Sequence, residues 1–376
     1  MTASWDELAD RLKDKSLKVF SDRAVAGPLY EVARQNDGDA ANAALKTLQG
    51  DFTKGFIVFF ITFAVLMTVM PDTFFGVAAL FILFPVMFFG TFALVAWLRR
   101  ETLVTFLTAA KGNFLARASA LSAMAERLDL SYVASPGGAP QTLKILSKLN
   151  FVSGRLRDLI DTLDENGGLD EAVEAAVASG MLVPDVVVLG GSKEQKARYY
   201  RQSALGHAFE DGFEGERNGI RFSAFEWIES VDDAPDKYHL LLVLNAPYRL
   251  HGVTQLRSRG TQWSKPVTER ELNDVQLVPA TFNDHFRLRS TDQVEARTIF
   301  NPAVVERILA LAHGEPFRAV ASGEHLVINF EGQNRFNLLD LQTGAWSDES
   351  IRETWSDIAD LLTVTDEMAH AFMVRD

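Results

Sequence analysis

Two apolar stretches decide how this chain is organised: residues 55–70 read GFIVFFITFAVLMTVM, and residues 74–98 read FFGVAALFILFPVMFFGTFALVAWL. Between Lys54 and Arg99 the only charged residue is Asp72, which lies in the short linker between the two stretches. A bilayer core about 30 Å thick is crossed by roughly 20 apolar helical residues. The sequence therefore predicts a transmembrane helical hairpin, with a kink at Pro85. The alternative, a buried hairpin in a soluble core, is disfavoured because neither stretch has a polar edge.

Basic residues flank this hairpin but are missing from its turn. They are Lys46 and Lys54 before the first stretch, and Arg99, Arg100, Lys111 and Arg117 after the second. The positive-inside rule then predicts that both termini lie in the cytoplasm. The absence of cysteine from all 376 residues agrees with a reducing compartment.

The rest of the chain divides around the hairpin at 55–98. We predict N-terminal cytoplasmic helices over 1–54, a helical stalk and helical region over 99–180, and an α+β cytoplasmic domain over 181–376. The formal net charge is −13, and residues 1–100 hold equal numbers of basic and acidic side chains, so the excess lies in the C-terminal region. An acidic domain is repelled by nucleic acid phosphates, which disfavours a nucleic acid partner.

Turn and capping signals organise the C-terminal domain. Asn218-Gly219 between two alternating runs predicts a β-hairpin over 207–229. Asn301 followed by Pro302 predicts a capped helix over 301–313. Further strands are expected at 185–189, 240–244, 253–259, 275–279, 285–290, 317–321 and 325–330, and a helix after Ser350. Strands and helices are clustered rather than strictly alternating, so the predicted fold class is α+β.

Two segments of this domain resemble a known family. They are HAFEDGFEGERNGIRF at 207–222 and STDQVEARTIFNPAVVERIL at 290–309. With the hairpin upstream, they resemble a bacterial family labelled as a domain of unknown function, family 3137. The resemblance covers about 180–340, with departures at Phe300 and at Phe336-Asn337-Leu338. It implies a membrane-anchored cytoplasmic domain without a stated activity, and hence a multi-pass protein of the bacterial inner membrane.

No catalytic, metal or cofactor motif is present in the sequence. There is no Gly-rich phosphate loop, no histidine pair at helical spacing and no cysteine. Carboxylates do cluster, at Glu210, Asp211, Glu214 and Glu216 and again at Asp292 and Glu295. Such a cluster suits a divalent cation or acid–base chemistry. We favour the alternative, in which one of these carboxylates forms a buried ion pair with Arg297.

The basic stretch at 249–270 is the other candidate. Arg249, Arg257 and Arg259 lie there near Trp263, and cations beside an indole suit lipid headgroups or an acidic partner. An ordinary solvated strand edge explains the same pattern.

The predicted function follows from these two segments. We expect a non-enzymatic binding or regulatory protein, anchored in the membrane, that engages a protein partner in a membrane assembly and contacts the lipid bilayer through the hairpin. The expected binding residues are Arg249, Arg257, Arg259, Trp263, Asp292, Glu295 and Arg297. The alternative is a membrane-tethered hydrolase that uses Asp211, Asp292 or Glu295. The sequence does not determine the oligomeric state.

Overall fold

The fold is that of a computed structural model, which describes residues 2–35, 38–69, 88, 90–91, 93–133, 140–149, 151, 209–229, 237–261, 268, 270–278, 280–332, 334–340 and 344–373. The chain forms two compact units. Unit 1 comprises Met1–Val25, Leu121–Leu338 and Asp348–Asp376, and unit 2 comprises Ala26–Ala120 and Leu339–Ser347. The predicted strand at 185–189 and most of the predicted helical region at 141–179 lie outside the described residues.

The described residues in the first third of the chain are mostly helical. Its elements are α1 (Trp5–Arg11), α2 (Leu17–Phe20), the π-helix η1 (Ser21–Ala26), α3 (Gly27–Gln35), α4 (Gly38–Val69) and α6 (Arg100–Arg127). Ser4 begins α1 with a capping box, since its side chain accepts from the Glu7 N–H while the Glu7 carboxylate accepts from the Ser4 N–H. Within unit 2, Arg99 forms an ion pair with Asp51 at 2.7 Å, and the Phe59 and Phe88 rings lie 5.4 Å apart.

The predicted membrane hairpin falls on α4 and on residues that follow it. In the described ranges no helix has both the length and the apolar character needed to cross a membrane. This finding overturns the predicted multi-pass location in the inner membrane. The described apolar part of α4, from Gly55 to Val69, is about 22 Å long at 1.5 Å per residue, which is short of a bilayer core of about 30 Å. Most of the second predicted span, 74–98, lies outside the described residues.

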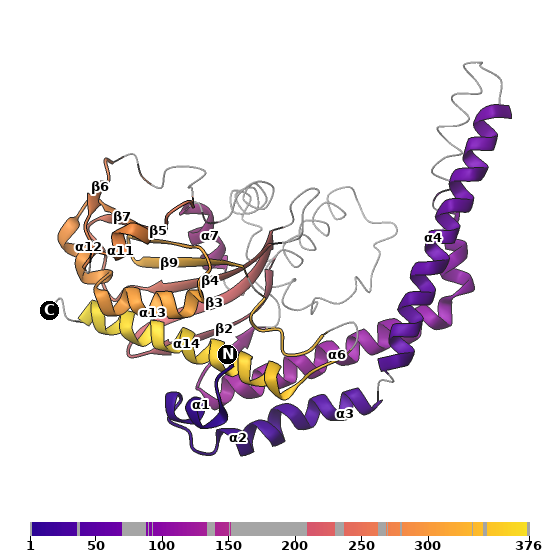
Figure 1. Cartoon of the computed structure of the whole chain (residues 1–376), viewed down its shortest axis with the longest axis horizontal. Helices are drawn as coiled ribbons and strands as arrows, with labels where there is room; N and C mark the ends of the chain where they lie inside the picture. Colours follow the sequence, from indigo (N-terminus) through magenta and orange to yellow (C-terminus); the bar gives the residue numbers. More distant parts are fainter. Residues whose placement is uncertain are drawn as a thin grey trace. The chain divides into compact units, whose positions relative to one another are not determined.

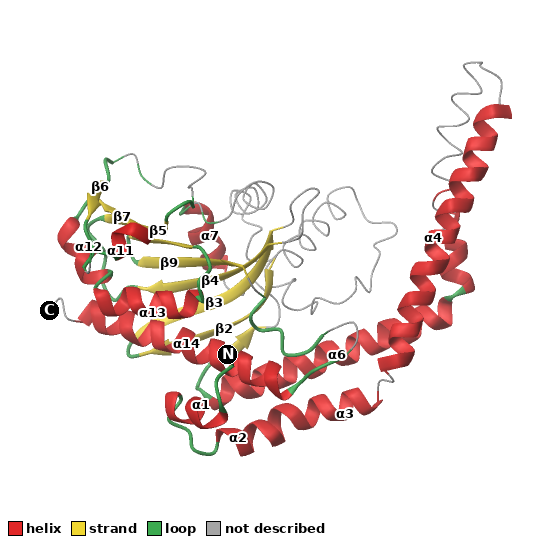
Figure 2. Ribbon diagram, in the orientation of Figure 1, coloured by secondary structure: helices red, strands yellow, loops and turns green. Residues whose placement is uncertain are grey.

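Unit 1 is built on one antiparallel sheet, so the predicted α+β class is confirmed (Figure 2). The nine strands found in the described chain have the order β1-β2-β3-β4-β9-β8-β5-β7-β6. Their bounds are β1 Ser131–Val133, β2 Phe209–Arg217, β3 Ile220–Glu229, β4 Lys237–Asn245, β5 Val253–Ser258, β6 Asn273–Val275, β7 Phe286–Ser290, β8 Phe317–Ser322 and β9 His325–Gly332. Besides the N-terminal helices α1 and α2, unit 1 contains α7 (Pro140–Lys148), α11 (Phe282–His285), α12 (Gln293–Ile299), α13 (Pro302–Ala312) and α14 (Asp348–Met373).

The two faces of the sheet differ in chemistry. Side chains alternate between faces along a strand, and the register places Leu240 and Leu242 of β4 beside Phe330 and Ile328 of β9. This apolar face packs against α13 and α14, which lie side by side (Figure 1). The contact is visible at Arg335, whose guanidinium lies 5.8 Å from the Phe330 ring and donates to the Leu311 carbonyl of α13 at 2.6 Å.

The opposite face carries more polar side chains and is contacted by α7 and by Phe151. Arg318 of β8 points to this face, donating to the Phe151 carbonyl at 3.2 Å and lying 5.6 Å from its ring. We refer to it as the α7 face. The charged groove described below lies on this face and at the strand ends beside it.

Candidate functional site

The predicted acidic segment at 292–297 has a structural role in the fold. Asp292 begins α12 as its N-cap, accepting from the backbone N–H groups of Val294 and Glu295, both at 3.0 Å. Glu295 is 3% exposed and accepts from the backbone N–H groups of His251 at 3.0 Å and Gly252 at 2.8 Å. These two carboxylates therefore fix the start of α12 and join it to the loop before β5.

The prediction that Arg297 is a buried, ion-paired residue is wrong. Its side chain is exposed, and it forms no ion pair within the described part of the chain. The reason is the short helix α12, which the sequence analysis did not predict. Ala296, Ile299 and Phe300 take its buried side, and Arg297 shares the outward side with Val294, three residues earlier.

The two groups of predicted carboxylates do not meet. Asp211 on β2 is buried and accepts from the Tyr132 hydroxyl at 2.8 Å. Glu295 follows β7, and the path β2-β3-β4-β9-β8-β5-β7 separates these strands. At about 4.8 Å per step, the two strands are about 29 Å apart. The structure thus gives no shared site to Asp211, Asp292 and Glu295, the residues on which the hydrolase alternative depends.

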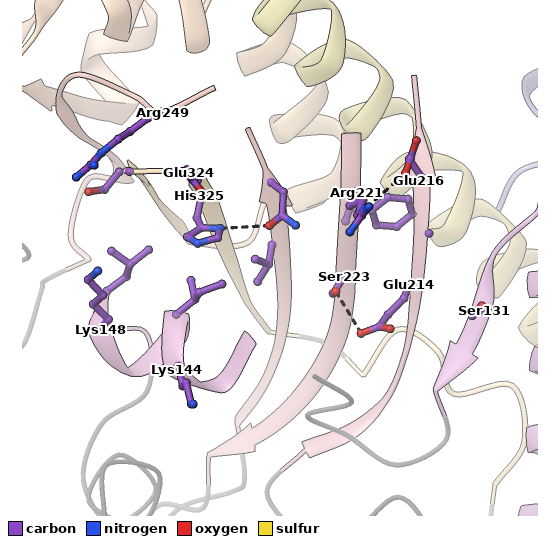
Figure 3. Close-up of a pocket in the computed structure, with 18 residues that line it drawn as sticks. Ser131, Lys144, Lys148, Glu214, Glu216, Arg221, Ser223, Arg249, Glu324 and His325 are labelled. Atoms are coloured by element: carbon purple, nitrogen blue, oxygen red, sulfur yellow. Dashed lines mark hydrogen bonds and ion pairs between the residues drawn. The ribbon is translucent and has the colours of Figure 1, made fainter. Parts of the chain in front are cut away.

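A groove of about 1000 Å³ lies instead where α7 passes over the strand ends of β2, β3, β4 and β9 (Figure 3). Five of its lining residues carry basic side chains, counting histidine, and three carry carboxylates. They are Lys144, Lys148, Arg221, Arg249 and His325, with Glu214, Glu216 and Glu324. The groove is therefore strongly polar, although Ile145, Leu149 and Val243 give it apolar contacts as well.

The charges of this groove are largely, but not wholly, separated by sign, since Glu324 lies beside Arg249 and Arg221 lies beside Glu216. Figure 3 shows Lys144, Lys148 and Arg249 on one side, and Glu214 and Glu216 of β2 on the other. We call these the basic wall and the acidic wall. The acidic wall is held by its own neighbours on β3: Ser223 donates to Glu214 at 3.2 Å, and Arg221 lies 3.6 Å from Glu216. A ligand with both signs of charge can be oriented between such walls.

His325 lies between the two walls. Its Nδ1 is 3.2 Å from Oδ1 of Asn245, its cross-strand neighbour. Burial lowers the pKa of His325, and Lys148 adds to the shift, while Glu324 opposes it. The imidazole is consequently neutral at pH 7, so it offers hydrogen bonds rather than charge to a ligand in the groove.

Part of the chain that forms this groove matches a known protein family. The model of a family described as a protein of unknown function, DUF3137, matches residues 240–370. This match covers about a third of the chain. A crystal structure of the mycobacterial trehalose monomycolate transport factor A, TtfA, is similar at 18% identity over 43% of this chain and 78% of that one, with a TM-score of 0.23. No curated protein matches the chain.

The DUF3137 region supplies only part of the groove. Asn245, Arg249 and His325 lie within 240–370, whereas the lysines of α7 and the carboxylates of β2 come from earlier in the chain. The predicted family is thus confirmed, and the groove is completed by segments outside the matched residues. The description of the family names no activity.

Only part of the predicted basic stretch lines the groove. Arg249 lines the groove, whereas Arg257 on β5 and Arg259 just after it lie outside the groove lining, and Trp263 lies outside the described residues. The sequence analysis missed Lys144, Lys148, Arg221 and His325. One signal was available: Lys144 and Lys148 are four residues apart, which places them on one side of a helix.

Proposed function

We propose that unit 1 is a binding module whose groove holds a peptide segment of a protein partner. The observation that carries this proposal is the pair of opposed walls, basic on α7 and at Arg249, and acidic on β2. Peptides carry both signs of charge along one chain. A groove with separated signs therefore favours one orientation of such a segment over the other.

The size of the groove supports a peptide over a small metabolite. At about 1000 Å³ it lies at the upper end of the range for small-molecule sites, about 300–1000 Å³. An extended peptide advances about 3.3 Å per residue, so a short segment can place successive side chains against both walls. We infer that the segment presents acidic residues to Lys144 and Lys148, and basic residues to Glu214 and Glu216.

Peptides of defined charge test this proposal. Three fluorescent ten-residue probes are compared by polarisation: one acidic, one basic, and one with an acidic half followed by a basic half. We expect the two-sign probe to bind most tightly and to weaken as salt rises, since the contacts are solvent-exposed charges. The double variant Lys144→Glu, Lys148→Glu should weaken the two-sign probe at least about tenfold, which is about 1.4 kcal/mol.

The matched control is Arg307→Glu. Arg307 is exposed on α13, which packs on the other face of the sheet, and its substitution reverses one positive charge, where the double variant reverses two, without touching the groove. This control should bind the two-sign probe as the unmodified protein does. Equal binding of all three probes, or equal loss in the control and in the double lysine variant, would refute the proposed groove function.

A further inference from the structure

A second, smaller cavity lies beside α14, which packs on the face of the sheet opposite the α7 face. Its volume is about 330 Å³, at the lower end of the range for small-molecule sites, about 300–1000 Å³. Asp357 of α14 and Arg335 line its buried part, and the exposed residues Glu353, Asn337 and His313 line the rest. The described residues that line this cavity all differ from those that line the peptide groove.

The carboxyl group of Asp357 lacks a close donor. The residue is 9% exposed, and its Oδ1 lies 3.5 Å from Nη1 of Arg335, which is longer than the hydrogen-bond range of about 2.7–3.2 Å. Among the described residues no other group donates to this carboxyl. Arg335 is engaged elsewhere, since Nη1 donates to the Leu311 carbonyl at 2.6 Å and Nη2 donates to Glu315 at 2.9 Å. An ionised Asp357 would therefore need a donor from outside the protein.

A second carboxylate lies one helical turn away. Glu353 and Asp357 are four residues apart on α14, which places them on one side of the helix with Cβ atoms about 6 Å apart. Glu353 accepts from the Thr2 hydroxyl at 3.2 Å and forms no ion pair within the described part of the chain. Asp360 of the same helix is different, because it forms an ion pair with Arg11. Glu353 and Asp357 are thus the two carboxylates of this cavity that lack a close cation.

The hydroxyl groups of the cavity also favour a ligand that donates. The Thr354 hydroxyl donates to the Ser350 carbonyl at 3.0 Å, and the Thr2 hydroxyl lies 3.0 Å from Glu349 and 3.2 Å from Glu353. A hydroxyl group has one donor and two lone pairs, so each keeps an acceptor lone pair after it has donated. An ammonium group has three donors and no acceptor. It therefore complements these carboxylates and hydroxyls better than an anion does.

We propose that this cavity is a binding site for a small aliphatic diamine, with one ammonium group at Asp357 and the other at Glu353. Two carboxylates one turn apart match two cations joined by a short chain, whereas a single cation leaves one carboxylate without a partner. A zwitterionic amino acid fits less well, because its carboxylate would have to displace the contacts of Arg335 to Leu311 and Glu315. This site is separate from the proposed peptide groove, so either proposal can fail alone.

The ionisable groups around the cavity make the binding depend on pH. The pKa of Asp357 lies at about 7, raised chiefly by burial, with Arg335 and His313 opposing the shift and Asp360 and Glu353 adding to it. The pKa of His313 is also raised, chiefly by its hydrogen bond to Asp360. A rise from pH 5 to pH 8 thus ionises Asp357 and removes charge from His313. Both changes favour a cation in the cavity, so diamine binding should strengthen over this interval.

Titration calorimetry of the full chain tests the proposal with diaminobutane, butylamine, butanediol and tetramethylammonium at equal ionic strength. At pH 8 we expect diaminobutane to bind at least about tenfold more tightly than butylamine, because it gains a second charged hydrogen bond. At pH 7 its binding should release protons, measured as heats that vary with the ionisation enthalpy of the buffer. The proposal is overturned if diaminobutane does not bind, if butylamine binds equally well, or if the diol or tetramethylammonium binds as tightly as the diamine.

The deciding variant is Asp357→Asn, with Asp284→Asn as its matched control. Asp284 is exposed on α11, outside the cavity lining. Asp357→Asn keeps the size of the side chain, and at pH 8 it should weaken diaminobutane about tenfold or more and reduce the proton release. Asp284→Asn should change neither quantity. Unaltered affinity and proton release in Asp357→Asn would overturn the proposal.

A second variant, Glu353→Gln, tests the other end of the ligand. Glu353 is exposed, so this substitution leaves the packing of α14 in place. It should lower the affinity for diaminobutane to about that of butylamine, with a smaller effect on butylamine itself. If Glu353→Gln retained the full preference for the diamine, the assignment of the second ammonium group to Glu353 would be wrong.

Discussion

The carboxyl group of Asp357 shows how burial sets the chemistry of a single residue. It lies on the side of α14 that faces Arg335, with Nη1 of Arg335 3.5 Å from its Oδ1. The pKa of Asp357 is raised to about 7, chiefly by burial; Arg335 and His313 oppose the shift, and Asp360 and Glu353 add to it. Because the folded pKa exceeds the unfolded value of 3.8, the protein loses stability as pH rises through the interval from about 4 to about 7.

The change Asp357→Asn should therefore act differently at pH 5 and pH 8. Asparagine cannot ionise, so the variant should gain stability relative to the unmodified protein on going from pH 5 to pH 8. The pKa exceeds pH 5 by about 2 units, so the upper limit of this relative gain is about 3 kcal/mol. Urea unfolding at the two pH values measures it, with Glu306→Gln on the exposed side of α13 as control. An effect of the same size at both pH values would contradict the raised pKa.

Glu295 and Arg297 lie two residues apart, but truncating Glu295 should destabilise the fold much more than truncating Arg297. Glu295→Ala leaves the backbone N–H groups of His251 and Gly252 without their buried acceptor, which should cost about 2–3 kcal/mol of unfolding free energy. Arg297→Ala removes an exposed side chain and should stay within about 0.5 kcal/mol. Denaturant unfolding of both variants checks the pair. A large loss for Arg297→Ala would contradict the exposed position of this side chain and would support the predicted ion pair.

At the scale of elements, predictions based on local chemistry were confirmed. Asn218 and Gly219 adopt φ values of 49° and 77°, as the hairpin turn requires, and they join β2 to β3. Asn301 caps α13, accepting from the Val304 N–H at 3.0 Å. Both signals are contained within a few residues, so the sequence alone is enough to read them.

Elements that depend on distant partners were not predicted. The strand expected at 275–279 is instead β6, Asn273–Val275, because its bounds are set by pairing with β7. The three-residue strand β1 exists through its pairing with β2. The candidate sites also depend on residues that are far apart in the sequence. Arg249, Arg257 and Arg259 were identified as a basic stretch, but their partners Arg287 and Arg318 are brought beside Arg257 only by the cross-strand register.

The bulge in β2 gives a prediction at this scale. The register between β2 and β3 shifts between Phe209 and Gly212, and a Cβ added at Gly212 would lie 2.2 Å from the Ala224 carbonyl oxygen and 2.6 Å from the Phe225 Cα. Gly212→Ala must therefore push the two strands apart, and we expect a loss of at least about 2 kcal/mol in unfolding free energy. Gly219→Ala is the comparison, since its Cβ meets open space and its positive φ costs about 1 kcal/mol. Equal losses for the two variants would show that the bulge tolerates a side chain.

At the scale of the whole molecule, unit 1 is assembled from segments far apart in the chain. Its N-terminal residues pack on α14, more than 300 positions away. The Trp355 indole donates to the Ser21 hydroxyl at 3.1 Å and lies 6.4 Å from the Phe20 ring, and Arg11 forms an ion pair with Asp360. Leu17 and Trp355 are fully buried. The N-terminal residues therefore complete the packing of α14.

Removing residues 2–25 should consequently loosen α14 while leaving the centre of the sheet intact. Trp355 would lose its cover, and burial of a large aromatic side chain contributes several kcal/mol. Hydrogen exchange measures the result element by element. We expect the amides of the first half of α14 to exchange at least about tenfold faster, whereas β4 and β9, which are paired on both sides within the sheet, keep their protection.

Deleting only Thr2 and Ala3 is the control, because that removes the hydroxyl contacts of Thr2 to Glu349 and Glu353 but spares Trp355. If the amides of α14 exchanged at the same rate in the long and short deletions, the N-terminal residues would not stabilise this helix, and the prediction would be wrong.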